Sequence, residues 1–226
     1  MENGGKAPAK QCAFDTFRRL VKEDSSGGWE KSWEVGATPW DLGKATPIIA
    51  HLVKTGTLPN GRALVPGCGT GYDVVEMASP DRYVVGLDLS KTAIDQSTKL
   101  FASLPNAKHF SFVAEDFFTW DPAEKFDLIF DYTFFCAIEP SMRPQWAEQM
   151  DKLLNPGGEL LTLMFPLNEL SGNPPYKADV EDYEKFLIPL GYEATSIVDN
   201  ELAIPSRKGN EKVGRWKKPS TITSTL

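Results

Sequence analysis

Short apolar runs alternate with amphipathic helical patterns along most of the chain. A continuous apolar run is typical of a strand covered on both faces, and apolar residues at helical spacing indicate a helix packed on one side. Strands that alternate with helices predict a doubly wound α/β sheet. The expected strands are 63–66, 83–88, 108–114, 126–131, 159–165, 192–198 and 211–217, and the expected helices are 13–22, 46–53, 73–78, 90–101, 145–154 and 179–190.

The segments between these patterns are interpreted as a tail, turns and loops. Residues 1–12 are small and polar, so we expect a disordered tail before a single domain formed by residues 13–226. Residues 24–28 and 155–158 are rich in glycine and polar residues and are expected to form a loop and a turn. The segment 168–176 is a loop long enough to shape a pocket.

Length and charge narrow the class of protein. A chain of 226 residues with 41% hydrophobic content suits one domain with a single core. The net charge of −7 opposes binding to nucleic acid unless basic residues gather locally, and the basic cluster at 207–218 is interpreted as a solvated loop and edge strand. Because no segment has the apolar core of a signal peptide or membrane helix, we expect a cytoplasmic protein without membrane or nucleic-acid partners.

Cysteine and histidine usage gives no sign of a metal centre. Cys12, Cys68 and Cys136 have no CxxC spacing, and only two histidines occur in the chain. This pattern argues against both a disulfide framework and a zinc site. One of the histidines, His51, falls in an expected helix, where a packed or exposed side chain is a more common outcome than a catalytic one.

A glycine-rich turn follows the first expected strand. Gly67-Cys-Gly-Thr-Gly71 lacks the bulk that would keep a ligand away from main-chain N–H groups. The second expected strand ends at Asp88, where an acidic side chain faces the two hydroxyls of a ribose. Together they indicate an adenosine-containing cofactor. The dinucleotide pattern G-x-G-x-x-G requires glycine where Tyr72 stands, so a nicotinamide cofactor is the weaker interpretation.

Two groups of aromatic residues have alternative interpretations. Half of the six tryptophans, Trp29, Trp33 and Trp40, precede the first strand. They either pack as a lid helix on the domain or face a cationic ligand, which aromatic faces attract by roughly 0.5–2 kcal/mol. Glu115-Asp-Phe-Phe118 follows the third strand and either binds an adenine ring or covers the core as a polar loop.

Five segments carry a resemblance to a known family: Trp29-Glu-Lys-Ser-Trp33, Thr38-Pro-Trp40-Asp41, Leu64-Val-Pro-Gly-Cys-Gly69, Glu115-Asp-Phe-Phe118 and Phe130-Asp-Tyr-Thr-Phe-Phe-Cys-Ala137. They closely resemble plant thiol and halide methyltransferases, which belong to the thiopurine methyltransferase superfamily. The likeness runs from about Trp29 to Lys218. It is therefore more specific than the glycine turn alone, which resembles motif I of Rossmann-like methyltransferases in general.

The resemblance implies a class I methyltransferase fold, with a seven-stranded sheet whose last strand is antiparallel. It implies methyl transfer from S-adenosylmethionine to halide ions, thiocyanate, hydrosulfide or small thiols, leaving S-adenosylhomocysteine. Carried over by position, the tryptophans would line the cofactor, Gly67 would pass under its methionine part and Asp88 would bind the ribose. Asp116 and Phe117 would take the adenine, and Tyr132 would stand near the sulfonium and the methyl group.

Anionic acceptors make few demands on catalytic side chains. Halides and thiocyanate have no proton to lose, and hydrosulfide is largely ionised near neutral pH, so no general base is required. A methyltransferase for a larger thiol or for an oxygen or nitrogen acceptor is the main alternative, and it would need a base and a wider pocket. A cofactor-binding module without catalysis is the other. The sequence leaves the order of acceptors and the oligomeric state open.

Overall fold

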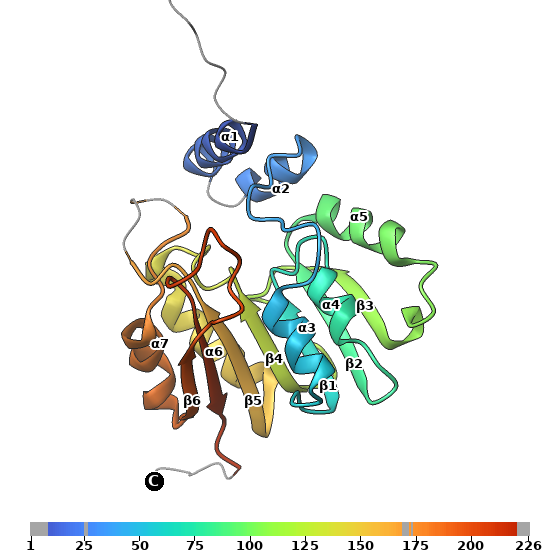
Figure 1. Ribbon diagram of the computed structural model, residues 1–226, viewed down its shortest axis with the longest axis vertical. Helices are drawn as coiled ribbons and strands as arrows, with labels where there is room; N and C mark the ends of the chain where they lie inside the picture. Colours follow the sequence, from blue (N-terminus) through green and yellow to red (C-terminus); the bar gives the residue numbers. More distant parts are fainter. Residues whose placement is uncertain (1–8, 25–26, 169–171, 173, 221–226) are drawn as a thin grey trace, which may run out of the picture.

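A seven-stranded mixed sheet forms the centre of the protein (Figure 1). The structure, a computed structural model, describes residues 9–24, 27–168, 172 and 174–220. The strand order is β3-β2-β1-β4-β5-β7-β6, in which the first five strands are parallel and β7 runs antiparallel to both of its neighbours. The expected class I methyltransferase sheet with an antiparallel last strand is confirmed. The strands are β1 (Gly61–Pro66), β2 (Arg82–Asp88), β3 (Phe110–Ala114), β4 (Phe126–Tyr132), β5 (Leu154–Met164), β6 (Glu193–Asp199) and β7 (Lys212–Lys217).

Helices cover both faces of this sheet. One apolar cluster joins α3, α4 and α5 to one face, and a second joins α6 and α7 to the other. Because β1, β2 and β4 are buried on both sides, their sequences read as nearly continuous apolar runs. The helices are α1 (Ala9–Glu23), α2 (Gly27–Glu34), α3 (Pro47–Lys54), α4 (Tyr72–Met77), α5 (Lys91–Phe101), α6 (Arg143–Leu153) and α7 (Val180–Leu187).

The strand order reverses between β1 and β4. Both strands are parallel to each other, so the glycine turn after β1 and the segment after β4 emerge at the same edge of the sheet. In open α/β sheets, such a reversal leaves a crevice at the carboxyl ends of the strands. Helices α1 and α2 lie over this edge (Figure 1). The fold therefore places two N-terminal helices as a cover above the switch point.

The N-terminal expectation needs correction. Residues 9–12 were expected in a disordered tail, but they form the first turn of α1, and 27–28 belong to α2 rather than to a loop. Residues 1–8 and 25–26 lie outside the described residues. The two helices approach closely at Gly28, where a Cβ atom would lie 2.7 Å from the carbonyl oxygen of Leu20. Packing of α1 against α2 is a tertiary contact, which helical periodicity does not reveal.

Two expectations about strands β5 and β7 were also wrong. The turn expected at 155–158 is part of β5, since Lys218 donates its N–H to the Gly158 carbonyl and extends the pairing beyond β7. The basic C-terminal strand was expected at an edge, but β7 lies between β5 and β6, and β6 forms the edge. Arg215 and Lys212 form ion pairs with Glu159 and Asp199, respectively.

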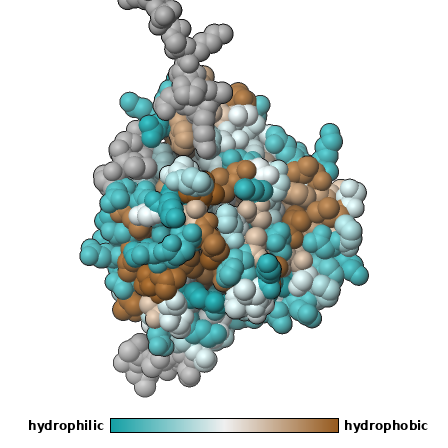
Figure 2. Space-filling model, in the orientation of Figure 1, coloured by the Kyte–Doolittle hydropathy of each residue, from teal (hydrophilic) through white to brown (hydrophobic). Residues whose placement is uncertain are grey.

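The surface carries both hydrophobic and hydrophilic side chains. Figure 2 shows hydrophobic patches interrupted by hydrophilic residues on the face seen in Figure 1. Within the part of the chain that the structure describes, no helix has the length and apolar character needed to cross a bilayer.

Candidate active site

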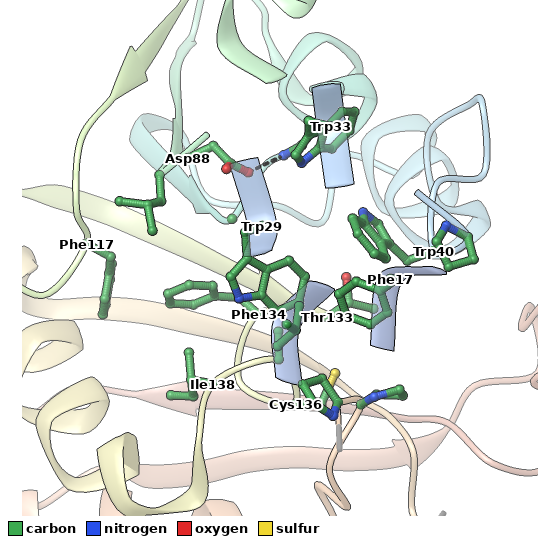
Figure 3. A pocket seen from close by; sticks show the side chains of 18 of the residues that line it. Phe17, Trp29, Trp33, Trp40, Asp88, Phe117, Thr133, Phe134, Cys136 and Ile138 are labelled. Carbon is green, nitrogen blue, oxygen red and sulfur yellow. Dashed lines mark hydrogen bonds between the residues drawn. The ribbon is translucent and has the colours of Figure 1, made fainter. Parts of the chain in front are cut away.

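A cavity of about 780 Å³ lies at the carboxyl edge of the sheet, beneath α1 and α2. Side chains from both halves of the chain face this space (Figure 3). Every predicted cofactor-binding residue lines it except Tyr132: the cavity brings together Trp29, Trp33, Trp40, Gly67, Asp88, Asp116 and Phe117. A smaller cavity of about 70 Å³ adjoins it on the other side of the glycine turn, and Tyr132 lines that one.

Asp88 is held at the end of β2 by two backbone donors. Its carboxylate accepts the N–H of Gly69 and the N–H of Ser90, each at 2.9 Å. A carboxylate has about four acceptor positions, so these two bonds orient the group and leave capacity for the hydroxyls of a ligand. Burial in the cavity wall raises the pKa of Asp88, although both N–H groups oppose this shift. A ligand that donates hydrogen bonds here would compensate for the lost hydration.

The glycine turn can take its shape only with small residues. Gly67 and Gly69 have φ angles of +60° and +52°, in the left-handed region. A Cβ atom would lie 2.7 Å from the Phe134 ring at Gly67 and 3.0 Å from the Trp33 ring at Gly69. The aromatic rings therefore pack directly on the main chain of the turn. Bare backbone, an acidic acceptor and aromatic walls fit the adenosine-containing cofactor expected from the sequence.

The aromatic side chains form two groups around the cavity (Figure 3). On the cover side, the ring of Trp40 lies 4.7 Å from Phe17, 5.4 Å from Trp29 and 6.2 Å from Trp33. On the sheet side, Phe117 and Phe134 meet edge to face at 4.9 Å. The tryptophans therefore pack with one another and also face the cavity, so both of their sequence-based interpretations hold in part.

Asp116 lies in the loop after β3. One of its carboxylate oxygens accepts the N–H of Phe118 at 3.0 Å, which fixes the loop. The following residue, Phe117, is buried and also borders the cavity. The acid and the ring thus stand together after β3, at the same cavity wall as Asp88 at the end of β2.

The loop after β4 is anchored by a buried acid. Asp131 is fully buried and accepts the N–H of Phe135 at 3.1 Å and the indole N–H of Trp146 at 2.8 Å. Thr133, in the same loop, has a φ of 59° and is the only non-glycine residue in the left-handed region among the residues that the structure describes. Such a conformation is costly and persists where surrounding contacts impose it. Thr133 lines both cavities.

Tyr132 and Arg207 meet at the boundary of the site. The Arg207 guanidinium donates to the Tyr132 hydroxyl, which in turn donates to Glu211 at 3.4 Å. Glu211 also lies 3.5 Å from Arg207 and accepts from Asn200 at 2.9 Å. Burial lowers the pKa of Arg207 and raises the pKa of Glu211. The group is thus a buried, nearly neutral network with its cation at the wall of the large cavity.

Arg207 was not recognised from the sequence. It was interpreted as part of a solvated basic cluster, but it is only 9% exposed and lines the large cavity. Sequence gave no signal that separates it from its neighbour Lys208, which is exposed. The cavity-lining residues of α1, which include Phe14, Phe17 and Arg18, were also missed, because nothing in the sequence shows that this helix faces the cavity.

Cys136 lines the large cavity, and Cys68 lines the smaller one. Cys136 borders the cavity but is buried, and desolvation raises the pKa of its thiol and that of Cys68. Both are therefore protonated, so neither is an activated nucleophile. His51 is exposed on α3. Within the described ranges, no group of three or more potential ligands is placed to hold a metal ion.

Comparison with known proteins identifies the family. The model of the thiopurine S-methyltransferase (TPMT) family matches residues 24–220. The chain is 74% identical to probable thiol methyltransferase 2 of Arabidopsis thaliana over the full length of both proteins. It is 60% identical to thiocyanate methyltransferase 1 of Brassica oleracea, over 88% of each chain.

Solved structures agree on the fold. The TM-score is 0.68 with 1,6-didemethyltoxoflavin-N1-methyltransferase of Burkholderia thailandensis, at 16% identity over 97% of this chain and 93% of the other. It is 0.61 with the N-methyltransferase NodS of Bradyrhizobium japonicum in complex with S-adenosylhomocysteine, at 18% identity over 92% and 98% of the two chains. The chain therefore belongs to the thiopurine S-methyltransferase family and is an S-adenosylmethionine-dependent methyltransferase.

Proposed function

We propose that the protein methylates thiocyanate, hydrosulfide, halide ions and small thiols. The observation that carries this proposal is Arg207, a cation only 9% exposed in the wall of the same cavity that Asp88 lines. Glu211 lies 3.5 Å from this guanidinium and balances its charge, but a guanidinium has five N–H donors, and those that Tyr132 and Glu211 do not occupy can bind a small anion. Support also comes from the names of similar proteins, a thiocyanate methyltransferase and a probable thiol methyltransferase.

Each predicted residue has a proposed role toward the cofactor. S-adenosylmethionine supplies a methyl group made electrophilic by its sulfonium. Asp88 would accept from the ribose hydroxyls, and Asp116 and Phe117 would hold the adenine. Trp29, Trp33 and Trp40 would face the sulfonium, which their rings attract, and would exclude water from it. Gly67 would leave room for the methionine part.

The acceptor would bind at the other end of the cavity, near Arg207. Removing water from an anion makes it a better nucleophile, and the apolar side chains of Phe165, 4.4 Å from the Arg207 guanidinium, and Ile204 offer no hydration in return. Halides, thiocyanate and hydrosulfide reach Arg207 as anions, so their methylation needs no general base. A small thiol would react as its thiolate, after losing its proton to solvent. Tyr132 is proposed next to the transferred methyl group, and its hydroxyl is already oriented by Arg207 and Glu211.

A product assay tests the proposal. The purified protein is incubated with labelled S-adenosylmethionine and, separately, with iodide, bromide, chloride, thiocyanate, hydrosulfide and a small thiol. Gas chromatography of the headspace detects the methylated products, and S-adenosylhomocysteine is measured in the same samples. We expect volatile methyl products and an equal amount of S-adenosylhomocysteine. Tight binding of S-adenosylhomocysteine without turnover of any acceptor would contradict the proposal and favour a module without catalysis.

A larger thiol is the second candidate. The cavity of about 780 Å³ extends past the adenosine end to Pro174, Pro175 and Ile138. A cavity of this size lies within the range of sites that bind drug-sized ligands. An aryl thiol added to the same panel decides between them, because a larger kcat/KM for it than for thiocyanate would identify a bulky thiol as the acceptor.

A further inference from the structure

Glu30 connects the cover of the cavity to the body of the domain. It lies in α2, between the two cavity-lining residues Trp29 and Trp33. One carboxylate oxygen accepts from the Ser90 hydroxyl at 2.5 Å, and the other accepts from the Thr92 hydroxyl at 2.6 Å. The backbone N–H of Thr92 lies 3.3 Å from both oxygens. Glu30 therefore connects α2, in which it lies, to the first turn of α5.

The same turn of α5 also holds the proposed ribose acceptor. Ser90 donates its backbone N–H to Asp88, while its side chain donates to Glu30 and accepts the N–H of Ala93. Ser90 is fully buried, whereas Glu30 and Thr92 are half-buried, so the junction lies at the edge of the core. Ser90 thus donates hydrogen bonds both to Glu30 of the cover helix α2 and to Asp88.

The charge of Glu30 suits this position. Burial alone would raise its pKa, but the hydrogen bonds from Ser90 and Thr92 outweigh burial and lower it. The group is therefore ionised at neutral pH, and hydrogen bonds to an ionised acceptor are roughly twice as strong as those to a neutral one. A negative charge at the N-terminus of a helix is further stabilised by the helix dipole.

A cofactor bound against Asp88 would be enclosed by the cover. Trp33 is 6% exposed and packs against the glycine turn, and Trp29 and Trp40 close the space beside it. If α2 moved away from α5, the cavity would open further for exchange of S-adenosylhomocysteine for S-adenosylmethionine. The Glu30 carboxylate must leave Ser90 and Thr92 in that motion.

We propose that Glu30 is a positioning residue that holds α2 closed over the cofactor and so sets the affinity and residence time of the cofactor. It does this without touching the acceptor or the transferred methyl group. A binding site that is closed for only a fraction of the time binds its ligand more weakly in proportion to that fraction. The inference rests on the assigned cofactor, and it is independent of the proposed acceptors.

Binding of S-adenosylhomocysteine tests the proposal without any acceptor. In Glu30→Ala we expect the dissociation constant from calorimetry to rise about tenfold, because hydrogen bonds to a charged group are lost. The dissociation rate, followed by tryptophan fluorescence in stopped flow, should rise by a similar factor. Glu30→Gln keeps a neutral acceptor and should fall between Glu30→Ala and wild type. Glu34→Ala is the matched control, since it removes an exposed carboxylate from the same helix.

A double-mutant cycle separates this role from a purely structural one. Thr92→Val removes the hydroxyl that Glu30 binds, so Thr92→Val and Glu30→Ala should have less than additive effects on S-adenosylhomocysteine affinity. Limited proteolysis should also show that S-adenosylhomocysteine protects α1 and α2 less well in Glu30→Ala. Unchanged affinity in Glu30→Ala would overturn the proposal. So would a lower melting temperature of the free protein with a wild-type dissociation rate, because Glu30 would then serve only as a cap of α5.

Discussion

The guanidinium of Arg207 donates a hydrogen bond to the hydroxyl of Tyr132, from 75 positions further along the chain. Its carbon also lies 4.4 Å from the centre of the Phe165 ring and 5.2 Å from that of the Tyr132 ring. Two aromatic faces and one hydrogen bond therefore fix a positive charge in the wall of the cavity. A charge that is already in place needs little reorganisation when an anion arrives.

The first prediction concerns the acceptor. Arg207→Leu should raise the KM for thiocyanate by about 10- to 100-fold, the loss associated with a charged hydrogen bond, and leave S-adenosylhomocysteine affinity unchanged. Lys208→Leu is the control, since it removes an exposed cation one residue away. Arg207→Leu removes the cation beside the buried Glu211 carboxylate, so Arg207→Leu/Glu211→Gln should be measured as well. A wild-type KM in both Arg207 variants would remove Arg207 from the acceptor site.

The second prediction concerns the ribose. Asp88→Asn should weaken S-adenosylmethionine and S-adenosylhomocysteine equally, by about 2–3 kcal/mol, because the ribose is common to both and the charged acceptor is lost. Calorimetry measures the two affinities, and the melting temperature reports any loosening of Gly69 and Ser90, which Asp88 also binds. Wild-type affinities in a folded variant would show that the ribose lies elsewhere.

The third prediction separates a cation site from a packed lid. Trp33→Leu should weaken S-adenosylmethionine more than S-adenosylhomocysteine, by roughly 0.5–2 kcal/mol, because only the former carries a sulfonium. Tyr132→Leu should behave in the same way. Trp120→Leu serves as control, since Trp120 stacks on Phe126 and does not line the cavity. Equal losses for the two ligands would mean that these rings are only scaffold.

The fourth prediction concerns pH and the loop after β4. Burial raises the pKa of Asp131 from an ordinary value of 3.8 to about 6, although the N–H groups of Phe135 and Trp146 oppose the shift. The folded state thus binds this proton more tightly than the unfolded state. The contribution of Asp131 to stability is present below about pH 4 and is lost as the pH rises through about 6.

Denaturant unfolding between pH 4 and pH 7 checks this sign. Asp131→Asn cannot titrate, so wild type should lose up to about 3 kcal/mol of unfolding free energy relative to Asp131→Asn across this range. Asp127→Asn is a useful control, because Asp127 lies in the same strand and is not fully buried. A difference between wild type and Asp131→Asn that stays constant with pH would contradict the raised pKa.

The order and type of most elements were predictable because they depend on local pattern. The apolar runs of β1, β2 and β4 and the proline that begins α3 are legible in the sequence. A boundary shifted where a tertiary partner extended an element, as at Leu154, which begins β5 and pairs with Phe126 of β4. The edge position of β6 could not be predicted, since strand order depends on which strands pair.

By itself the sequence determined the glycine turn, the acid at the end of β2 and the aromatic segments. Each of these depends on residue type at short spacing, where backbone geometry leaves little freedom. The tertiary structure alone decided which distant side chains meet: Glu30 with Ser90 across 60 positions, and Tyr132 with Arg207 across 75. Hydrophobic periodicity reports that a residue is buried, but not against what. A buried cation in a cavity wall and an exposed one next to it therefore look alike until the chain is folded.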